Sequence, residues 1–347
     1  MNRYHRQVLL PQIGDAGQAR LGAVRVLLVG CGALGSVLAD QLVRAGVGWL
    51  RLVDRDVVET TNLQRQVLYD EKDAANGTPK AAAAADRLRR VNSAVQVHPV
   101  VTDVHAGNVE DLAGLGRDGP PMDLILDGTD NVETRYLLND VAVKHGIPWV
   151  YGACVGTEGR MMAVRPPDGP CLRCVFPEPP GPGELPTCDT AGVLGPVAAV
   201  VASLQAVAAF KLLTGHGEAV AEELVTLDLW SGRWRQTSLA GARRADCKTC
   251  GRREFEFLER GADRSVSLCG RNAVQVRPGV GRGLDLGVVA DRLKGCGAVE
   301  QTPHLVRCRW DDGTDLRLTV FPDGRAIVQG TNDPDRARSV YARWVGM

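Results

Sequence analysis

The sequence has no excess of charge of either sign. Its 347 residues include 41 lysines and arginines and 41 aspartates and glutamates, so the formal net charge at pH 7 is zero. A chain without a strong overall field does not attract nucleic acid or an anionic membrane surface by charge alone, and any basic site has to be local. We therefore expect no nucleic-acid partner.

The sequence also has no apolar leader at its start. It begins MNRYHRQ, which lacks the apolar core of a secretory signal, so we expect a cytoplasmic protein. The ten cysteines are then expected to be thiols, metal ligands or nucleophiles, and not disulfides. Residues 192–213 are about as long as the ~20 residues that cross a bilayer. Because they contain Pro196, Ser203 and Gln205, we expect a buried helix, with a subunit interface as one place for it, and no membrane.

Short apolar strands alternate with helices over residues 24–151. Strands are expected at 24–29, 49–53, 96–101, 122–126 and 147–151, with helices after the first strand and at 78–90 and 131–145. This alternation predicts a doubly wound, Rossmann-like, mostly parallel sheet. Residues 152–170 and 225–230 are expected to extend it as antiparallel strands, and residues 177–186, rich in proline and glycine, to form a mobile crossover loop.

A glycine-rich turn follows the first of these strands. Gly30, Gly32 and Gly35 have the spacing G-x-G-x-x-G between an apolar run and a helix, which is typical of a phosphate-binding turn. The helix N-terminus adds free N–H groups that stabilise an anion. Asp54, after the second strand, is placed to bind a ribose. These residues alone fit a nicotinamide dehydrogenase as well as other nucleotide enzymes.

Charged residues near the other strand ends favour chemistry at phosphate. Asp127 and Asp130 stand in DGTDN, where carboxylates hold Mg²⁺ beside phosphates or, alternatively, serve as a turn residue and a helix N-cap. Arg65 in NLQRQ and Lys80 in TPK add cations that stabilise the charge built up in phosphoryl or nucleotidyl transfer. A dehydrogenase has no evident use for them.

Two CxxC pairs are the metal-site candidates. Cys171 and Cys174 form one pair, and Cys247 and Cys250 form the other. Four thiolates complete a tetrahedral zinc site that is closed to water, so we expect structural and not catalytic zinc. The separation between the pairs is wider than in common zinc ribbons, and two independent redox pairs remain the alternative.

Together these motifs resemble the ATP-dependent adenylyltransferases of the ThiF/MoeB/HesA group, relatives of ubiquitin-activating enzyme E1. The resemblance covers residues 3–251 and ends with the CxxC pairs that flank TCDTAGVLGP at 187–196. Its other motifs are RYHRQ at 3–7, GCGALG at 30–35, an Asp-x-Asp at 54–56, TNLQRQ at 61–66, PK at 79–80 and DGTDN at 127–131. Relatives usually have two adjacent glycines where this chain has Gly32 and Ala33, but the three spaced glycines remain.

The resemblance implies roles for the site residues. ATP would be bound with Asp54 on its ribose and Arg65 and Lys80 on its phosphates, while Asp130 holds Mg²⁺. Arg6 would reach as an arginine finger into the neighbouring site of a homodimer. The remaining implied ATP-site residues are Gly30, Gly32, Gly35, Asp56, Asn62, Gln66 and Asn131.

The implied reaction is adenylation of the C-terminal glycine carboxylate of a small ubiquitin-like sulfur carrier ending in Gly-Gly, with release of pyrophosphate. Thiamine, molybdopterin and thiolated-tRNA synthesis all use such carriers, and a cysteine desulfurase or sulfurtransferase is a further expected partner. An NAD-dependent oxidoreductase and a non-catalytic carrier-binding scaffold are the alternatives.

Cys188 aligns with the flexible-loop cysteine of the family and leaves two readings open. As a thiol just before an apolar helix, whose N-terminus would lower its pKa, it would attack the adenylate to form a thioester or an acyl disulfide. Alternatively it is dispensable, because members of the group differ on this point.

The resemblance stops after Cys250, so residues 1–251 are expected to form one domain. Residues 252–264 are interpreted as a charged linker, and residues 265–347 as a small α+β domain, with a ferredoxin-like arrangement as one option. Strands are expected at 273–276, 305–310, 316–321 and 326–329, and helices at 286–294 and 334–344. Cys269 is expected to be ordinary core, with a sulfurtransferase thiol as the alternative. From its position alone, this domain is expected to help dock the carrier.

Overall fold

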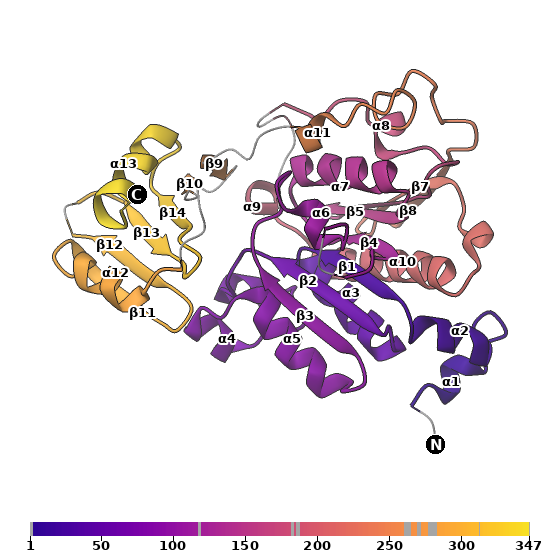
Figure 1. Ribbon diagram of the computed structural model, residues 1–347, viewed down its shortest axis with the longest axis horizontal. Helices are drawn as coiled ribbons and strands as arrows, with labels where there is room; N and C mark the ends of the chain where they lie inside the picture. Colours follow the sequence, from indigo (N-terminus) through magenta and orange to yellow (C-terminus); the bar gives the residue numbers. More distant parts are fainter. Residues whose placement is uncertain are drawn as a thin grey trace. The chain divides into compact units, whose positions relative to one another are not determined.

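The computed structural model describes residues 3–116, 119–181, 184, 188–259, 265–268, 272–276, 283–311 and 313–346. The chain forms two compact units (Figure 1). The first comprises Met1–Gly181 and Ala191–Gly261, and the second comprises Pro182–Thr190 and Ala262–Met347.

An eight-stranded sheet forms the centre of the first unit. Its strand order is β3-β2-β1-β4-β5-β6-β7-β8, with the strands up to β5 parallel and the rest antiparallel. The strands are β1 (Arg25–Val29), β2 (Trp49–Asp54), β3 (Gln96–Val101), β4 (Leu124–Asp127), β5 (Trp149–Val155), β6 (Glu158–Val164), β7 (Glu223–Asp228) and β8 (Arg233–Ser238). The predicted sheet with its antiparallel extension is confirmed. β8 was not predicted, because all of its residues are exposed and it has no buried apolar face.

Helices cover both faces of this sheet (Figure 1). α3 (Ala33–Ala45), α5 (Lys80–Val91) and α10 (Gly195–Leu213) pack on one face, and α6 (Val109–Leu112), α7 (Val132–His145), α8 (Leu172–Val175) and α11 (Glu256–Glu259) on the other. Alternate residues of β1 enter the two cores, with Val26 and Leu28 in one and Leu27 and Val29 in the other. Burial on both faces is why this strand is a continuous apolar run in the sequence. The first unit also contains α1 (His5–Val8), α2 (Gly14–Leu21) and η2 (Gly217–Ala219).

The long polar connection after β2 is partly helical. It contains η1 (Thr60–Asn62) and α4 (Glu71–Asn76). Both are short and have no apolar periodicity from which they could have been predicted. α5 begins at Lys80 with Pro79 at its N-cap position, one residue later than the sequence predicted. At this start the backbone N–H of Lys80 donates to the carbonyl of Asp56 at 2.9 Å, which connects α5 to the segment just after β2.

α10 is long and apolar enough, by length and composition, to cross a membrane, although half of its apolar window is buried inside the unit. It packs against α3, β5 and β6, and its Gln205 is fully buried. A single helix of this kind is weak evidence for a membrane span, because core helices have the same length and composition.

Cys188 does not directly precede α10. It is the first residue of the four-residue helix α9 (Cys188–Ala191), and α10 begins only at Gly195. Between them Gly192 has φ +73°, and Val193 forms a bridge with Gly156. The effect of the α10 N-terminus on this thiol therefore stays a prediction. The Cys188 side chain lies outside the described part of the structure.

The predicted linker starts later than residue 252. α11 lies inside the predicted linker of residues 252–264, yet its Phe257 is only 3% exposed. The ring centroids of Phe257 and Tyr136 are 5.1 Å apart. Glu256 forms an ion pair of 2.8 Å with Arg173. The charged sequence was interpreted as a linker because the partners of Phe257 and Glu256, Tyr136 and Arg173, lie far away in the chain.

The second unit contains an antiparallel six-stranded sheet of order β11-β12-β13-β14-β10-β9. Its elements are β9 (Ser265–Leu268), β10 (Ala273–Val276), α12 (Leu286–Leu293), β11 (Gly297–Gln301), β12 (Val306–Trp310), β13 (Arg317–Val320), β14 (Ala326–Gln329) and α13 (Pro334–Trp344). The α+β class is confirmed. The ferredoxin-like option is wrong, since four consecutive strands follow α12 where that fold alternates β-α-β-β-α-β. Cys269 lies outside the described residues.

Candidate functional site

The predicted nucleotide residues meet at one edge of the first sheet. β2, β1 and β4 are neighbours and run parallel, so the turns that follow them lie side by side at their carboxyl ends. That edge is where ligands bind in doubly wound sheets.

The three glycines of the turn serve different purposes. Gly30 has φ +89°, and a Cβ there would lie 2.6 Å from the carbonyl of Gly128. A Cβ on Gly35 would lie 1.9 Å from the carbonyl oxygen of Gly30. Gly32 is different, because the nearest atom to a Cβ there is Gln66 Nε2 at 3.9 Å. The fold thus requires Gly30 and Gly35, whereas the described residues leave open space beside the Gly32 backbone.

Two alanine substitutions should separate these roles. Gly35→Ala is expected to lower the free energy of unfolding by about 1–3 kcal/mol, the usual cost of overpacking, because its Cβ meets rigid backbone. Gly32→Ala is expected to unfold like the wild type but to bind ATP more weakly. Urea unfolding and ATP titration of both variants measure the two effects. Equal destabilisation by both variants would contradict this assignment.

Asp54 joins the end of β2 to the glycine turn. Its Oδ2 accepts the N–H of Cys31 at 2.6 Å, and its Oδ1 accepts the N–H of Asp56 at 2.7 Å. Burial raises the pKa of Asp54, and the ammonium of Lys80 acts against that shift. Each carboxylate oxygen has a second lone pair, so the predicted ribose contact is compatible with these bonds.

Lys80 and Asp56 form a pair within the site. The Nζ of Lys80 lies 3.3 Å from Oδ2 of Asp56, and the lysine side chain is only 8% exposed. Arg55 lies on the other side of Asp56, at 3.7 Å, and contacts Asp103 at 3.2 Å. Asp56 was predicted to bind the cofactor; in the structure it holds the lysine that was predicted to contact phosphate.

The TNLQRQ segment contributes one buried amide beside the glycine turn. Gln66 is 4% exposed, and its Oε1 has no hydrogen-bond partner within the described residues. Asn62 is also buried, but its Oδ1 accepts the N–H of Glu59 at 3.1 Å, so its visible role is to cap η1. Arg65 donates to the carbonyl of Thr61 at 2.9 Å. Its Cβ lies 3.5 Å from the position of a Cβ on Gly195, at the start of α10.

Some polar side chains of the DGTDN turn make structural hydrogen bonds, whereas Asp130 is exposed to solvent. Asp127 is fully buried, and its carboxylate accepts from Thr129 and from Arg135, whose Nε lies 3.1 Å away. Asn131 caps α7 by accepting the N–H of Thr134 at 2.9 Å, so the reading of Asp130 as the N-cap is wrong. Asp130 is exposed and makes no hydrogen bond or ion pair to another described residue. It is therefore the carboxylate of this turn that is left for a metal ion.

Arg6 lies on the surface of the first unit. It belongs to the short helix α1 and is exposed. Leu9 and Leu10, directly after α1, are also exposed, at 67% and 50%. An arginine beside exposed leucines fits a contact with another molecule better than it fits the interior of this unit.

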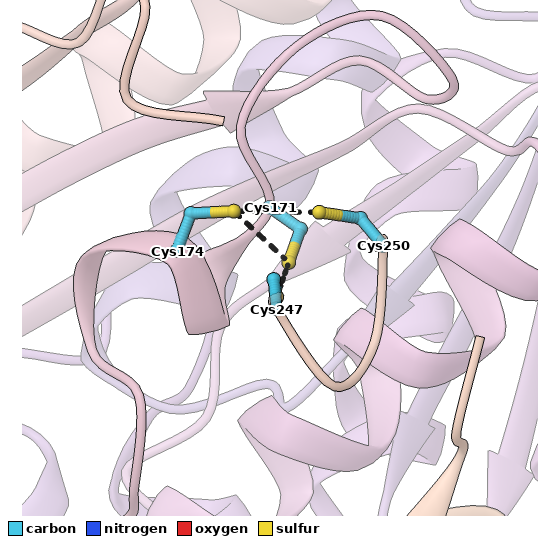
Figure 2. A group of neighbouring side chains, drawn as sticks. All are labelled: Cys171, Cys174, Cys247 and Cys250. Atoms are coloured by element: carbon cyan, nitrogen blue, oxygen red, sulfur yellow. Dashed lines mark hydrogen bonds between the residues drawn. The ribbon is translucent and has the colours of Figure 1, made fainter. Parts of the chain in front are cut away.

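The two CxxC pairs come together in one cluster (Figure 2). The four Sγ atoms lie within 4.8 Å of one another and all four residues are buried. Cys174 Sγ lies 3.3 Å from Cys250 Sγ, and Cys171 Sγ lies 3.6 Å from Cys247 Sγ. Tetrahedral Zn–S bonds of about 2.3 Å would separate the sulfurs by roughly 3.8 Å. The donor set therefore fits zinc, and the alternative of two separate redox pairs does not describe this arrangement.

α7 supports both halves of the cysteine cluster, a role that no motif in the sequence indicated. Asn139 accepts the N–H of Leu172 at 2.9 Å, and Asp140 accepts from the hydroxyl of Thr249 at 3.0 Å and the N–H of Phe257 at 2.9 Å. Burial raises the pKa of Asp140 to about 6. These bonds connect one helix to segments more than 30 residues away, and no local pattern predicts such pairs.

Comparisons with known proteins show the family to which the chain belongs. Residues 4–249 match the model described as the ThiF family. The sulfur carrier protein ThiS adenylyltransferase of Bacillus subtilis is 44% identical over 346 residues, which are 99% of each chain. The sulfur carrier protein adenylyltransferase of Thermus thermophilus is 41% identical over 256 residues, covering 72% of this chain and 91% of the relative. In fold, the crystal structure of E. coli MccB with succinimide has a TM-score of 0.62 at 20% identity, covering 72% of this chain and 75% of that one. The chain belongs to the ThiF family.

Proposed function

We propose that this chain uses ATP to adenylate the C-terminal glycine carboxylate of a small ubiquitin-like sulfur-carrier protein. The observation that carries the proposal is the sheet edge where Gly32 leaves space beside the buried amide of Gln66 and the paired ammonium of Lys80. The B. subtilis relative, matched over 99% of its length, is named for the same activity on ThiS. An NAD-dependent oxidoreductase is not favoured, because it has no use for this combination of residues.

In the proposed reaction a carboxylate oxygen of the carrier attacks the α-phosphorus of ATP. The bond from that phosphorus to the bridging oxygen of the β-phosphate breaks, and pyrophosphate leaves with the electron pair. Lys80 and Arg65 stabilise charge on the phosphates, the N–H groups at the start of α3 bind them, and Asp54 orients the ribose. A carboxylate nucleophile needs no general base, which agrees with the absence of a histidine from the GCGALG, TNLQRQ, PK and DGTDN motifs.

Two metal ions are part of the proposal. Asp130 offers the kind of hard oxygen ligand that suits Mg²⁺, which would neutralise phosphate charge. Cys171, Cys174, Cys247 and Cys250 offer a closed thiolate set for structural zinc, which would stabilise the fold without taking part in the reaction.

The remaining proposals concern partners. A homodimer would bring Arg6 of one protomer to the site of the other, and a cysteine desulfurase or sulfurtransferase would supply sulfur to the adenylated carrier. We propose that the reaction takes place in the cytoplasm. We further propose that the second unit helps to dock the carrier.

The test is ATP–pyrophosphate exchange with purified full-length protein and the ThiS, MoaD-like and tRNA-thiolation carriers of one bacterium. Exchange is expected only when Mg²⁺ and a carrier ending in Gly-Gly are both present. A carrier without its last glycine is the control, because it misplaces the attacking carboxylate. Cys188→Ala should retain exchange under either reading of that thiol, since exchange reports adenylation alone. Protein that binds every carrier but never exchanges would support the scaffold alternative.

A further inference from the structure

The carboxylate of Asp130 depends on its backbone for its position. It is exposed and forms no hydrogen bond or ion pair to another residue that the structure describes. Its neighbours in the turn are fastened: the N–H of Gly128 donates to the carbonyl of Val29 at 2.8 Å, and Asn131 caps α7. The position of the Asp130 backbone is therefore set by the contacts of the neighbouring residues of the turn.

Arg135 holds this turn from the α7 side. Its Nε donates to the Asp127 carboxylate at 3.1 Å, and its Nη2 donates to the carbonyls of Thr129 at 2.7 Å and Gly152 at 3.2 Å. The Asp127 carboxylate is fully buried, so removing Arg135 would leave its charge unpaired and would destabilise the whole unit. It is a poor place to test positioning alone.

Gln205 holds the same turn from the opposite face of the sheet. This residue of α10 is fully buried, and its Nε2 donates to the carbonyl of Asp127 at 2.8 Å and to that of Val150 at 3.2 Å. One amide hydrogen is thus used on Asp127, the last residue of β4, and the other on Val150, the second residue of the adjacent strand β5. Gly152 makes room for this side chain, because a Cβ there would lie 2.4 Å from it.

A buried polar side chain at this position lowers the stability of the fold unless its hydrogen bonds compensate. The rest of α10 packs through valine, alanine and leucine, and the Oε1 of Gln205 has no hydrogen-bond partner among the described residues. Burying an amide with an unused acceptor lowers stability. The compensating feature is the fixed carbonyl of Asp127, three residues before Asp130.

We propose that Gln205 is a positioning residue, which fixes the turn at residues 127–131 so that Asp130 meets the metal ion of bound ATP; this rests on the proposed function. Gln205 touches neither nucleotide nor metal. Its loss weakens metal binding in the nucleotide complex and leaves metal-free nucleotide binding in place.

The test uses full-length protein, α,β-methylene-ATP and Mn²⁺, a paramagnetic substitute for Mg²⁺ that is counted by electron paramagnetic resonance. Two variants remove the interaction from different sides: Gln205→Met has no donors, and Gly152→Ala displaces the glutamine. Both are expected to bind Mn²⁺ about tenfold more weakly in the presence of the analogue, the effect of losing one well-placed hydrogen bond. Their affinity for the metal-free analogue should change less than about twofold on the same scale.

Ser203→Ala is the matched control. Its hydroxyl accepts from Gln41 at 2.8 Å, so this variant also removes a side-chain hydrogen bond from α10, but away from the turn. It should bind Mn²⁺ like the wild type. If Gln205→Met fails to fold, Gly152→Ala decides the question. That variant keeps the Gln205 amide and only displaces it from the carbonyl of Asp127.

The outcomes separate the two levels of inference. Wild-type affinity for Mn²⁺ in a folded Gln205→Met or Gly152→Ala overturns the positioning role while the proposed function stands. Equal weakening in Ser203→Ala also overturns it, because the effect is then general destabilisation of α10. A wild type that does not bind the analogue contradicts the proposed function itself.

Discussion

Replacing Cys247 with serine is expected to remove the zinc and to destabilise the chain by several kcal/mol. Cys247 Sγ lies 3.6 Å from Cys171 Sγ in a buried group of four sulfurs (Figure 2). Structural zinc is bound to small domains with apparent free energies of about 10–16 kcal/mol, and that energy is available only to the folded chain. Metal analysis should give one zinc per wild-type chain, and thermal unfolding should show a lower Tm for the variant.

Cys31→Ser is the control for this experiment. Cys31 is a buried cysteine of the same unit, 1% exposed, that lies outside the cluster. It should cost some stability, as any buried polar substitution does, but should leave the zinc content at one. Purified wild-type protein that holds no zinc and keeps its Tm in the presence of a strong chelator would refute the assignment.

The effect of metal loss should extend beyond the cluster. α7 begins at the capped end of the DGTDN turn, and its Asn139 and Asp140 bind the two cysteine segments. Loosening those segments removes partners from buried polar groups of the same helix. We therefore expect the zinc-depleted protein to lose ATP binding before it loses its parallel strands.

The sequence predicted best where burial on both faces imposes a pattern. β1 and β2 were found within one residue of their expected bounds, because a strand covered by helices on each face needs a short apolar run. β8, η1 and α4 were missed, since exposed or very short elements require no such run. α11 was missed for another reason: Phe257 and Glu256 are held by Tyr136 and Arg173, and such partners are not visible along the chain.

For the site, the motifs predicted which segments meet but not what each polar atom does. The two CxxC pairs do meet in one cluster, and the glycine turn and Lys80 lie at the same edge of the sheet, while their contacts with ATP stay predictions. Asn62 and Asn131 were expected at the ligand, yet their side chains cap helices, which any Asn can do at a helix start. The only indication of Gln205 in the sequence is that it is an amide within an alanine-rich segment. Only the fold shows that it faces the carbonyl of Asp127.

Arg6→Ala is expected to reduce adenylation by a factor of about 10³–10⁵, the range known for arginine fingers in phosphoryl transfer. Arg6 is exposed on α1, and Leu9 and Leu10 after it are 67% and 50% exposed. A dimer that buries these leucines would bring the guanidinium into a water-poor site, where it stabilises phosphate charge far better than in bulk solvent. Exchange rates with saturating carrier measure the loss.

Arg3→Ala is the matched control from the same segment. Arg3 donates to the carbonyl of Val91 at 2.7 Å, so it is directed at its own unit. Its removal should leave the exchange rate within about twofold of wild type, as expected of an exposed residue outside the site.

Mixing two inactive variants tests whether Arg6 acts across the dimer. Arg6→Ala and Asp130→Ala homodimers should each be nearly inactive. In a mixed dimer one site lacks both groups, and the other combines the Asp130 of one protomer with the Arg6 of its partner. Random pairing at 1:1 makes half of the dimers mixed, so about a quarter of wild-type activity should return. If tagged subunits exchange, as co-purification would show, and the mixture stays inactive, then Arg6 acts within its own chain or outside the site.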